Sequence, residues 1–467
     1  SGTNTLGGFT PDSFPNNRSF INQTAAGADA DVRQNGGLNR SSVVQNAAAE
    51  ADVRQSGTYN NSTVQQNAGS AGATASVTQG GDYGDNRSSV IQSADATAIV
   101  NQTNANSGAP DAPSNDSFVT QSAGGAFANV SQTGDDNLSR VTQSDLATAT
   151  VSQTGELHES TVTQSGIASA SVTQSGLNQT STVTQTGDLV DATVLQSNAD
   201  NTSTVTQSGS LSSADVMQSG QRNTSTVAQT STTLSEAIVE QSGNDNISSV
   251  TQRPTGGHTA AVLQTGDLNR STVDQGGLAN ETGDNTANGV IQAGDVGVSQ
   301  ITQRGGFQSA FVEQLDGGAR NGSVIDQGTN GGFLGIGAGV SQSASVRQGG
   351  SDMTSSITQR GIDQTATVNQ SGVNNDSTIS QGGNFGSSHL ASVTQTGTDG
   401  ISLITQSGSD HDATLTQGGV GNDSMILQSG TGNSAIVSQS SSDNISTVNQ
   451  SGMGNTANVT QGSTGGL

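Results

Sequence analysis

Glutamine recurs along this chain about every eleven residues, and its side chain places a hydrogen-bond donor and an acceptor at each of these positions. Read back from the C-terminal end, the series begins Gln461, Gln450, Gln439, Gln428, Gln417, Gln406. Amides that stack above one another at the spacing of β-strands can form a continuous ladder, in which each amide donates to the next. A buried amide without a partner costs about 1 to 3 kcal/mol, so such a ladder is stable only as a continuous stack.

Histidine is the side chain best suited to acid–base catalysis, but no carboxylate or nucleophile stands beside the histidines at a fixed spacing. His158, His258, His389 and His411 lie in or near different turns, where we expect solvated side chains. The chain has no cysteine, and no phosphate-binding loop or metal-ligand spacing occurs. The sequence therefore predicts that the protein is not an enzyme and that it binds no cofactor.

The composition argues against an ordinary globular core and against a nucleic-acid partner. Of the 467 residues, 29% are hydrophobic and 2% aromatic, and the formal net charge is -25. Such values are typical of disordered chains unless a strong regular pattern overrules them. The thirteen basic residues are scattered arginines that form no stripe to neutralise phosphates.

A branched aliphatic residue stands two positions before most of the glutamines, as in Val162, Val183, Val205 and Val448. Apolar and polar residues thus alternate with period two, which is the pattern of a β-strand, whereas the period of 3.6 that a helix needs is missing. Clusters of Gly, Asn, Asp and Ser separate the segments and favour tight turns. The pattern predicts strands of five to seven residues joined by turns of about four.

The position four before each glutamine alternates between serine and alanine, as in Ser160, Ala170, Ser181 and Ala192. The repeat is therefore about 22 residues long and contains two strands, which gives some 19 repeats. Stacking one repeat on the next would form two parallel sheets that face each other. The predicted fold is an all-β, amyloid-like β-solenoid of about 19 two-strand coils.

Two regions follow from the repeat: a non-repeat N-terminal segment, 1–18, and the solenoid, 19–467. Insertions at 103–116, 276–287, 328–343 and 382–390 are predicted to be loops at the coil ends. Inside the coils, stacked amides and aliphatic residues are predicted to form a structural ladder. Its members are Gln34, Gln45, Gln164, Gln174, Gln185, Gln196, Gln207, Gln218, Gln417, Gln428, Gln439, Gln450, Val162, Val183, Val205 and Val448.

The units resemble the curlin repeat of the curli major subunit, in which Ser-x-x-x-x-x-Gln and Ala-x-x-x-x-x-Gln alternate within about 22 residues. The resemblance covers residues 19–462, although many turns here read Gly-x-x-Asn. It implies a secreted protein that polymerises into extracellular cell-surface fibres of a biofilm matrix. It also implies export through a dedicated outer-membrane pore, to which residues 1–18 could be the address, and often a nucleator.

The partner that we expect is another copy of the chain. An uncovered solenoid end is an open template for further strands, and the few residues after Gln461 are expected to be too short to cover the last strands. The predicted assembly ends are Ser19, Gln23, Ala30 and Gln34 at one end and Ser446, Gln450, Ala457 and Gln461 at the other.

Two alternatives keep the chain monomeric. Thr-x-Thr pairs such as Thr182 to Thr184 could form an outward threonine array like that of ice-binding solenoids, although Arg140 and Leu403 interrupt it. A calcium-stabilised adhesin could instead use the acidic turns at Asp135-Asp136 and Asp82 to Asp85, but these acids vary in position from repeat to repeat.

Overall fold

The computed structural model describes most of the repeat region. The residues described are 16–81, 85–104, 115–230, 233–253, 257–276, 286–315, 317–328, 341–383 and 387–462. Residues 1–15 of the predicted N-terminal segment lie outside this part, as do most of the insertions at 103–116, 276–287 and 328–343 and the middle of 382–390. No helix among the described residues is long and apolar enough to span a membrane.

The chain divides into two compact units, each a stack of short strands. Unit 1 is Ser1–Arg222 and unit 2 is Asn223–Leu467. The strands of unit 1 are β1 (Arg18–Gln23), β2 (Asp29–Gly37), β3 (Arg40–Gln45), β4 (Glu50–Thr58), β5 (Asn61–Gln66), β6 (Thr74–Gly80), β7 (Arg87–Gln92), β8 (Thr97–Thr103), β9 (Asp116–Gln121), β10 (Phe127–Asp135), β11 (Leu138–Gln143), β12 (Thr148–Glu156), β13 (Glu159–Gln164), β14 (Ala168–Leu177), β15 (Thr180–Gln185), β16 (Val190–Gln196), β17 (Thr202–Gln207) and β18 (Ser213–Gln218).

Unit 2 continues the same pattern. Its strands are β19 (Thr224–Gln229), β20 (Glu236–Gln241), β21 (Ile247–Gln252), β22 (Thr259–Gln264), β23 (Arg270–Gly276), β24 (Thr286–Gln292), β25 (Val298–Arg304), β26 (Gln308–Gln314), β27 (Gly322–Gly328), β28 (Gln342–Gln348), β29 (Thr354–Arg360), β30 (Gln364–Gln370), β31 (Asp376–Gly382), β32 (Leu390–Gln395), β33 (Ile401–Ser409), β34 (Asp412–Gln417), β35 (Asp423–Thr431), β36 (Ser434–Gln439), β37 (Ile445–Gln450) and β38 (Thr456–Gln461).

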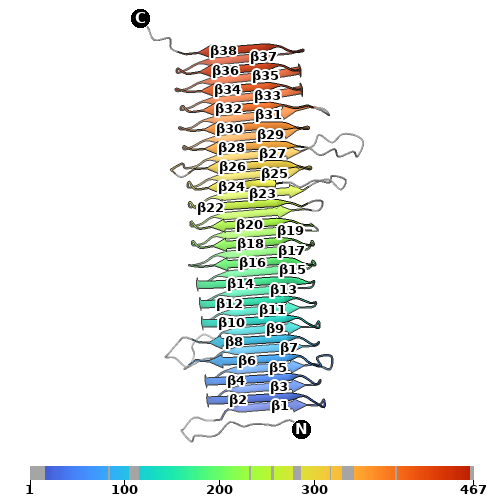
Figure 1. Ribbon diagram of the computed structural model, residues 1–467. Coiled ribbons are helices and arrows are strands. Elements are labelled where there is room, and N and C mark those ends of the chain that lie inside the picture. The colour runs from blue at the N-terminus through green and yellow to red at the C-terminus, as the bar shows by residue number, and fades with distance from the viewer. Residues whose placement is uncertain are drawn as a thin grey trace. The chain divides into compact units, whose positions relative to one another are not determined.

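In each unit the odd-numbered strands form one parallel sheet and the even-numbered strands form another (Figure 1). Each strand pairs with the strand one coil further along, so that like residues lie side by side. Between β13 and β15, for example, Ser160 faces Ser181 and Val162 faces Val183. The chain has nineteen odd-numbered and nineteen even-numbered strands. The predicted all-β solenoid of two-strand coils is therefore confirmed.

Alternation of side chains along each strand separates the core from the surface. In β15 the residues Ser181, Val183 and Gln185 are buried, while the threonines between them are half-buried on the outer face. The core thus consists of columns of small, aliphatic and glutamine side chains. Repetition in register supplies the buried glutamine amides with partners from the neighbouring coil, so the fold is stable without a large aromatic core.

Several strands are longer than the predicted five to seven residues. Strands β2, β4, β10 and β12 have nine residues each, and β14 has ten. The added length comes from the turns, which also pair in register: Gly134 faces Gly155 on β12, and Gly155 faces Gly176 on β14. The turn backbone therefore contributes to the stack as the strands do.

One strand departs from this regular register. The pairing of β24 with β26 shifts between Ala287 and Gly289, as it does where β24 pairs with β22. The shift falls at Asn288, which departs from the serine and alanine alternation because it stands four residues before Gln292. This strand begins at the end of the predicted insertion 276–287. A bulge of this kind lets a strand absorb an extra residue without loss of the flanking pairs.

Candidate functional site

The glutamine that ends each core segment lies inside the solenoid and bonds to the glutamine of the next coil. In the even-numbered sheet of unit 1, Nε2 of Gln174 donates to Oε1 of Gln196 at 2.9 Å, and Gln196 donates to Gln218 at 2.8 Å. All three side chains are fully buried. They form a column of amides along the stacking direction.

A second column follows the odd-numbered sheet, where Gln164 donates to Gln185 and Gln185 to Gln207, both at 2.8 Å. The other glutamines of the predicted ladder make the same bond: Gln34 to Gln55 at 2.7 Å, Gln45 to Gln66 at 2.8 Å, Gln417 to Gln439 at 2.9 Å and Gln428 to Gln450 at 2.9 Å.

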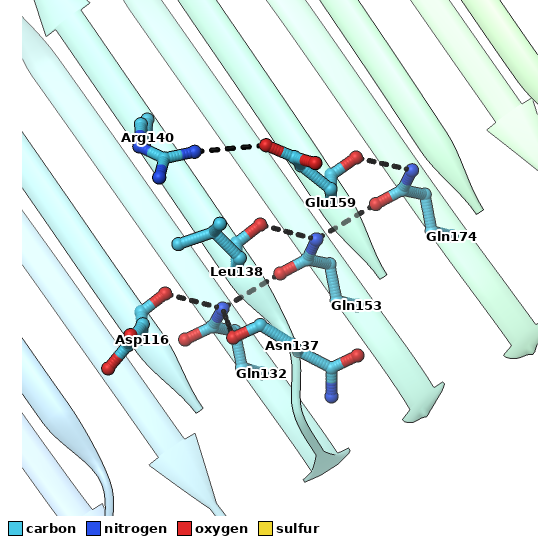
Figure 2. A network of polar contacts seen from close by, with 8 residues as sticks. All are labelled: Asp116, Gln132, Asn137, Leu138, Arg140, Gln153, Glu159 and Gln174. Carbon is cyan, nitrogen blue, oxygen red and sulfur yellow. Dashed lines mark hydrogen bonds and ion pairs between the residues drawn. The ribbon is translucent and has the colours of Figure 1, made fainter. Parts of the chain in front are cut away.

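Main-chain carbonyl groups fix the direction of these amides. In Figure 2, Nε2 of Gln153 donates to the carbonyl oxygen of Leu138 at 3.0 Å as well as to Oε1 of Gln174 at 2.9 Å. Nε2 of Gln174 in turn donates to the carbonyl oxygen of Glu159 at 3.0 Å. A carbonyl oxygen can only accept, so the amide nitrogen must face it. In the columns described, each glutamine therefore donates toward the C-terminal side.

Asparagine forms a shorter column at the position immediately before an odd-numbered strand, and this column runs the other way. Its side-chain bonds in unit 1 are Asn60 to Asn39 at 3.1 Å, Asn86 to Asn60 at 3.0 Å, Asn115 to Asn86 at 3.1 Å and Asn137 to Asn115 at 3.0 Å. In these side-chain bonds Nδ2 donates toward the N-terminal side, while Nδ2 of Asn115 and of Asn137 also donates to a turn carbonyl on the C-terminal side. The two kinds of column give the stack a defined chemical direction.

The four histidines occupy inward positions immediately before a strand, which shows that the prediction of solvated turn residues was wrong. His158 stands in the asparagine column before an odd-numbered strand, and the other three precede even-numbered strands. His158, His258, His389 and His411 are each at most 2% exposed. Each lies immediately before a strand, where asparagine stands in many other coils. That placement is the feature of the sequence from which the burial of the histidines could have been predicted.

Hydrogen bonds orient these rings. Nε2 of His411 bonds to the carbonyl oxygen of Ser407 at 2.9 Å, and Nδ1 accepts from the backbone N–H of Asn433 at 3.2 Å. The ring of His389 stacks on that of His411 at 5.2 Å between centroids, with 6° between planes. Burial lowers the pKa of His389 and of His158.

Aliphatic residues form a dry column beside the amides. Val162, Val183 and Val205 are fully buried, and Val448 in the last odd-numbered strand is 6% exposed. The serines that share this face are buried too, but the hydroxyls of Ser160 and many like it have no hydrogen-bond partner. The polar stabilisation of the stack therefore comes from the amides and the backbone, and serine is present because it is small.

The acidic turn at Asp135-Asp136, which the structure describes, does not gather the ligands of a cation site. Asp135 ends β10 and is 7% exposed. Burial, followed by the charges of Asp135 and Asp116, raises the pKa of Asp136. No group of three or more histidines and carboxylates close enough to hold a metal ion occurs in the described ranges. The second acidic turn, at 82–85, falls mostly outside them.

The first coil, formed by β1 and β2, has an open face. Ser19 is exposed and Gln23 and Gln34 are half-buried, whereas Ala30 is buried. Gln23 donates to Gln45 and Gln34 to Gln55, each at 2.7 Å. No residue of the described chain donates to Oε1 of Gln23 or of Gln34. This end of unit 1 thus presents two amide acceptors.

The last coil, formed by β37 and β38, presents the complementary groups. Ser446 and Gln450 are 6% exposed, and Ala457 and Gln461 are half-buried. Nε2 of Gln450 donates to the carbonyl oxygen of Ser434 at 2.9 Å, and Nε2 of Gln461 to that of Ile445 at 3.0 Å. Neither donates to a further glutamine within the described residues. This end of unit 2 thus has two amide nitrogens with donor capacity left.

Comparison with known families gives one match. The sequence model of the curlin associated repeat matches residues 363–397, 408–440 and 419–452, all within unit 2. The matched residues include strands β30 to β32 and β34 to β37, with their glutamines. No curated protein matches the chain.

Proposed function

Because the chain carries curlin associated repeats, we propose that it is the structural subunit of an extracellular, curli-like functional amyloid fibre. Members of the curlin-repeat family are structural fibre subunits rather than catalysts. The β-solenoid fold is compatible with this role, because a stack of parallel strands can be continued by another copy of itself. In this proposal the fibre contributes to a biofilm matrix and to surface adhesion.

The observation that carries the proposal is the match between the two open coils. One end offers the Oε1 atoms of Gln23 and Gln34, and the other offers the Nε2 groups of Gln450 and Gln461. If β1 of one molecule pairs with β37 of another and β2 pairs with β38, Gln450 donates to Gln23 and Gln461 donates to Gln34. Each new joint then repeats the bonds found inside a unit.

The remaining inward residues fit the same joint. Ser446 meets Ser19 and Ala457 meets Ala30, so small residues face small residues as they do between internal coils. Val448 meets Ile21, which continues the aliphatic column. Burial of these edges and completion of the backbone ladder provide the driving force for assembly.

Fibre growth from the purified chain tests the proposal. We expect sigmoidal kinetics, acceleration by preformed seeds and cross-β spacings of about 4.8 and 10 Å in fibre diffraction. Gln450→Leu together with Gln461→Leu removes both open donors and should reduce the elongation rate strongly while circular dichroism still reports a β-solenoid.

The matched control places the same pair of substitutions inside unit 1, as Gln185→Leu with Gln196→Leu. Both of these residues are fully buried, and each accepts and donates within its column. This variant should lose folding stability, but the coils at both ends keep their amides. A wild-type chain that stays monomeric for days at high concentration would contradict the proposed function.

Two further partners belong to the same proposal. A curli-type outer-membrane pore would export the chain, with residues 1–18 as its address, and a nucleator would present a first coil edge. Deletion of residues 1–18 should then block export and leave fibre growth of the purified protein intact.

A further inference from the structure

The outer face of the two end coils carries a second matched feature. Among the odd-numbered strands, only β1 and β37 have asparagine directly before the final glutamine, as Asn22-Gln23 and Asn449-Gln450. The strands between them mostly carry threonine there, for example Thr163. The two asparagines therefore mark the first and last strand of one sheet type.

Both asparagines are exposed, and neither side chain makes a hydrogen bond within the described chain. A joint that sets β1 on β37 brings them side by side in register. Side chains in such positions lie about 5 Å apart, within reach of an amide bond between neighbouring strands. Exposed amides bridge coils elsewhere in the structure, since Nδ2 of Asn178 donates to Asp200 at 2.7 Å.

The inward columns discriminate weakly between two ways of joining the ends. Strands β37 and β38 both end in Val-x-Gln, so β1 could pair with either of them and still align valine and glutamine. We call these arrangements odd-on-odd and odd-on-even. In the odd-on-even joint Asn22 meets Thr460 and Asn449 meets Arg33, so the amide pair is lost.

We infer that Asn22 and Asn449 of two copies pair across the joint and select the odd-on-odd arrangement. This inference rests on the proposed end-to-end assembly and adds a specificity contact to it. The contact lies on the outer face, so it leaves the core columns unchanged. It forms only between molecules, which accounts for the absence of a partner for either asparagine in the isolated chain.

A charge-swap test uses seeds and monomers of different variants. Heavily fragmented fibres of the Asn449→Asp protein serve as seeds, with tips in excess over monomer so that the first addition is measured. Wild-type, Asn22→Asp or Asn22→Arg monomers are added at low ionic strength. Facing carboxylates should slow elongation by up to about fivefold relative to wild-type monomer, whereas the arginine variant should elongate faster. On wild-type seeds, which lack the facing carboxylate, the difference between the two variants should shrink.

The matched control is Thr163→Asp, which adds the same charge at the equivalent position of an internal strand. This monomer should elongate both kinds of seed with the same relative rate. Rates that depend on the monomer alone and not on the seed would overturn the pairing but leave fibre assembly standing. Failure of the wild-type chain to elongate its own seeds would overturn the proposed function itself.

Discussion

At the scale of single residues, the buried histidines are the groups most sensitive to their surroundings. His389 accepts the backbone N–H of His411 at Nδ1, so a second proton on the ring of His389 would set two donors against each other. The titratable groups that act on His389 are His411, which lowers its pKa, and Asp410, which raises it. A buried donor left without an acceptor costs about 1 to 3 kcal/mol. The ring of His389 is therefore held neutral by the coil above.

This arrangement predicts an acid-sensitive step in stability. Burial lowers the pKa of His389 below its ordinary value of 6.5, so the unfolded chain takes up a proton first as the pH falls. The free energy of unfolding should be fully maintained above pH 6.5 and should decline as the pH falls below it toward the lowered pKa. Urea denaturation between about pH 5 and pH 8 measures this slope.

Asparagine is the matched replacement, because it fills the same position in other coils. The double variant His389→Asn with His411→Asn should flatten the slope in this window. The raised pKa values of Asp116 and Asp136 favour the folded state as the pH falls, and carboxylates titrate at lower pH than histidine. A variant with the wild-type slope would show that other groups govern the response.

Residue positions with a strict repeat were predictable from the sequence, and positions without one were not. Period two assigns Val183 and Gln185 to the inner face, because successive side chains of a strand point to opposite sides. The inward turn of His158 escaped prediction because histidine usually lies at the surface of a turn. Asn22 and Asn449 escaped it because outward positions vary freely and a single matched pair has no period.

At the scale of the elements, the turns connect the strands and also contribute to the packing between neighbouring coils. Gly155 has a φ of 127°, and a Cβ built there would lie 2.0 Å from the carbonyl oxygen of Gly176 in the next coil. The turn backbone of neighbouring coils therefore packs too closely for a side chain. This packing explains the long strands, whose lengths the sequence could not predict because glycine-rich segments look alike whether they pair or not.

Gly155→Ala is expected to destabilise unit 1 by about 2 kcal/mol or more, since it combines an unfavourable φ with a clash against the backbone. Gly432→Ala is the matched control, because Gly432 has a φ of 66° but no atom within 4 Å of an added Cβ. The Gly432→Ala variant should lose less folding stability, because only its unfavourable φ contributes. Urea midpoints of the two variants separate these contributions, and equal losses would contradict the role of stacking.

The strand count was predictable for a simple reason. A strand of a two-strand coil must repeat its inward residues in every coil, so the alternation of Ser160 and Ala170 reveals the 22-residue period. The division into two units was not predicted, because the repeat continues on both sides of Arg222 without a change in pattern.

At the scale of the whole molecule, charge is unevenly distributed along the chain. The first coils balance Arg18, Arg33, Arg40 and Arg54 against Asp29, Asp31, Glu50 and Asp52. The charged side chains after Arg360 are all aspartates: Asp363, Asp376, Asp399, Asp410, Asp412, Asp423 and Asp443. Two acidic ends repel each other more strongly than an acidic end repels the balanced one, so charge also favours contact between unlike ends.

Assembly should therefore depend on ionic strength. With a net charge of -25, subunits repel one another at long range, and salt screens this repulsion over a Debye length of about 10 Å at 0.1 M. The seeded elongation rate should rise as sodium chloride increases from about 10 to 150 mM at pH 7.5. Thioflavin fluorescence with a fixed number of seeds measures the rate. A rate that does not respond to salt would show that charge repulsion does not limit growth.

The common orientation of the glutamine amides has a consequence for any fibre built from this chain. Its two tips would be chemically different surfaces, one ending in the nitrogens of Gln450 and Gln461 and the other in the oxygens of Gln23 and Gln34. A fragment that imitates the first coil would fit one tip and find no complement at the other. Such a fragment would therefore arrest growth at one tip only, and each fibre would be polar along its length.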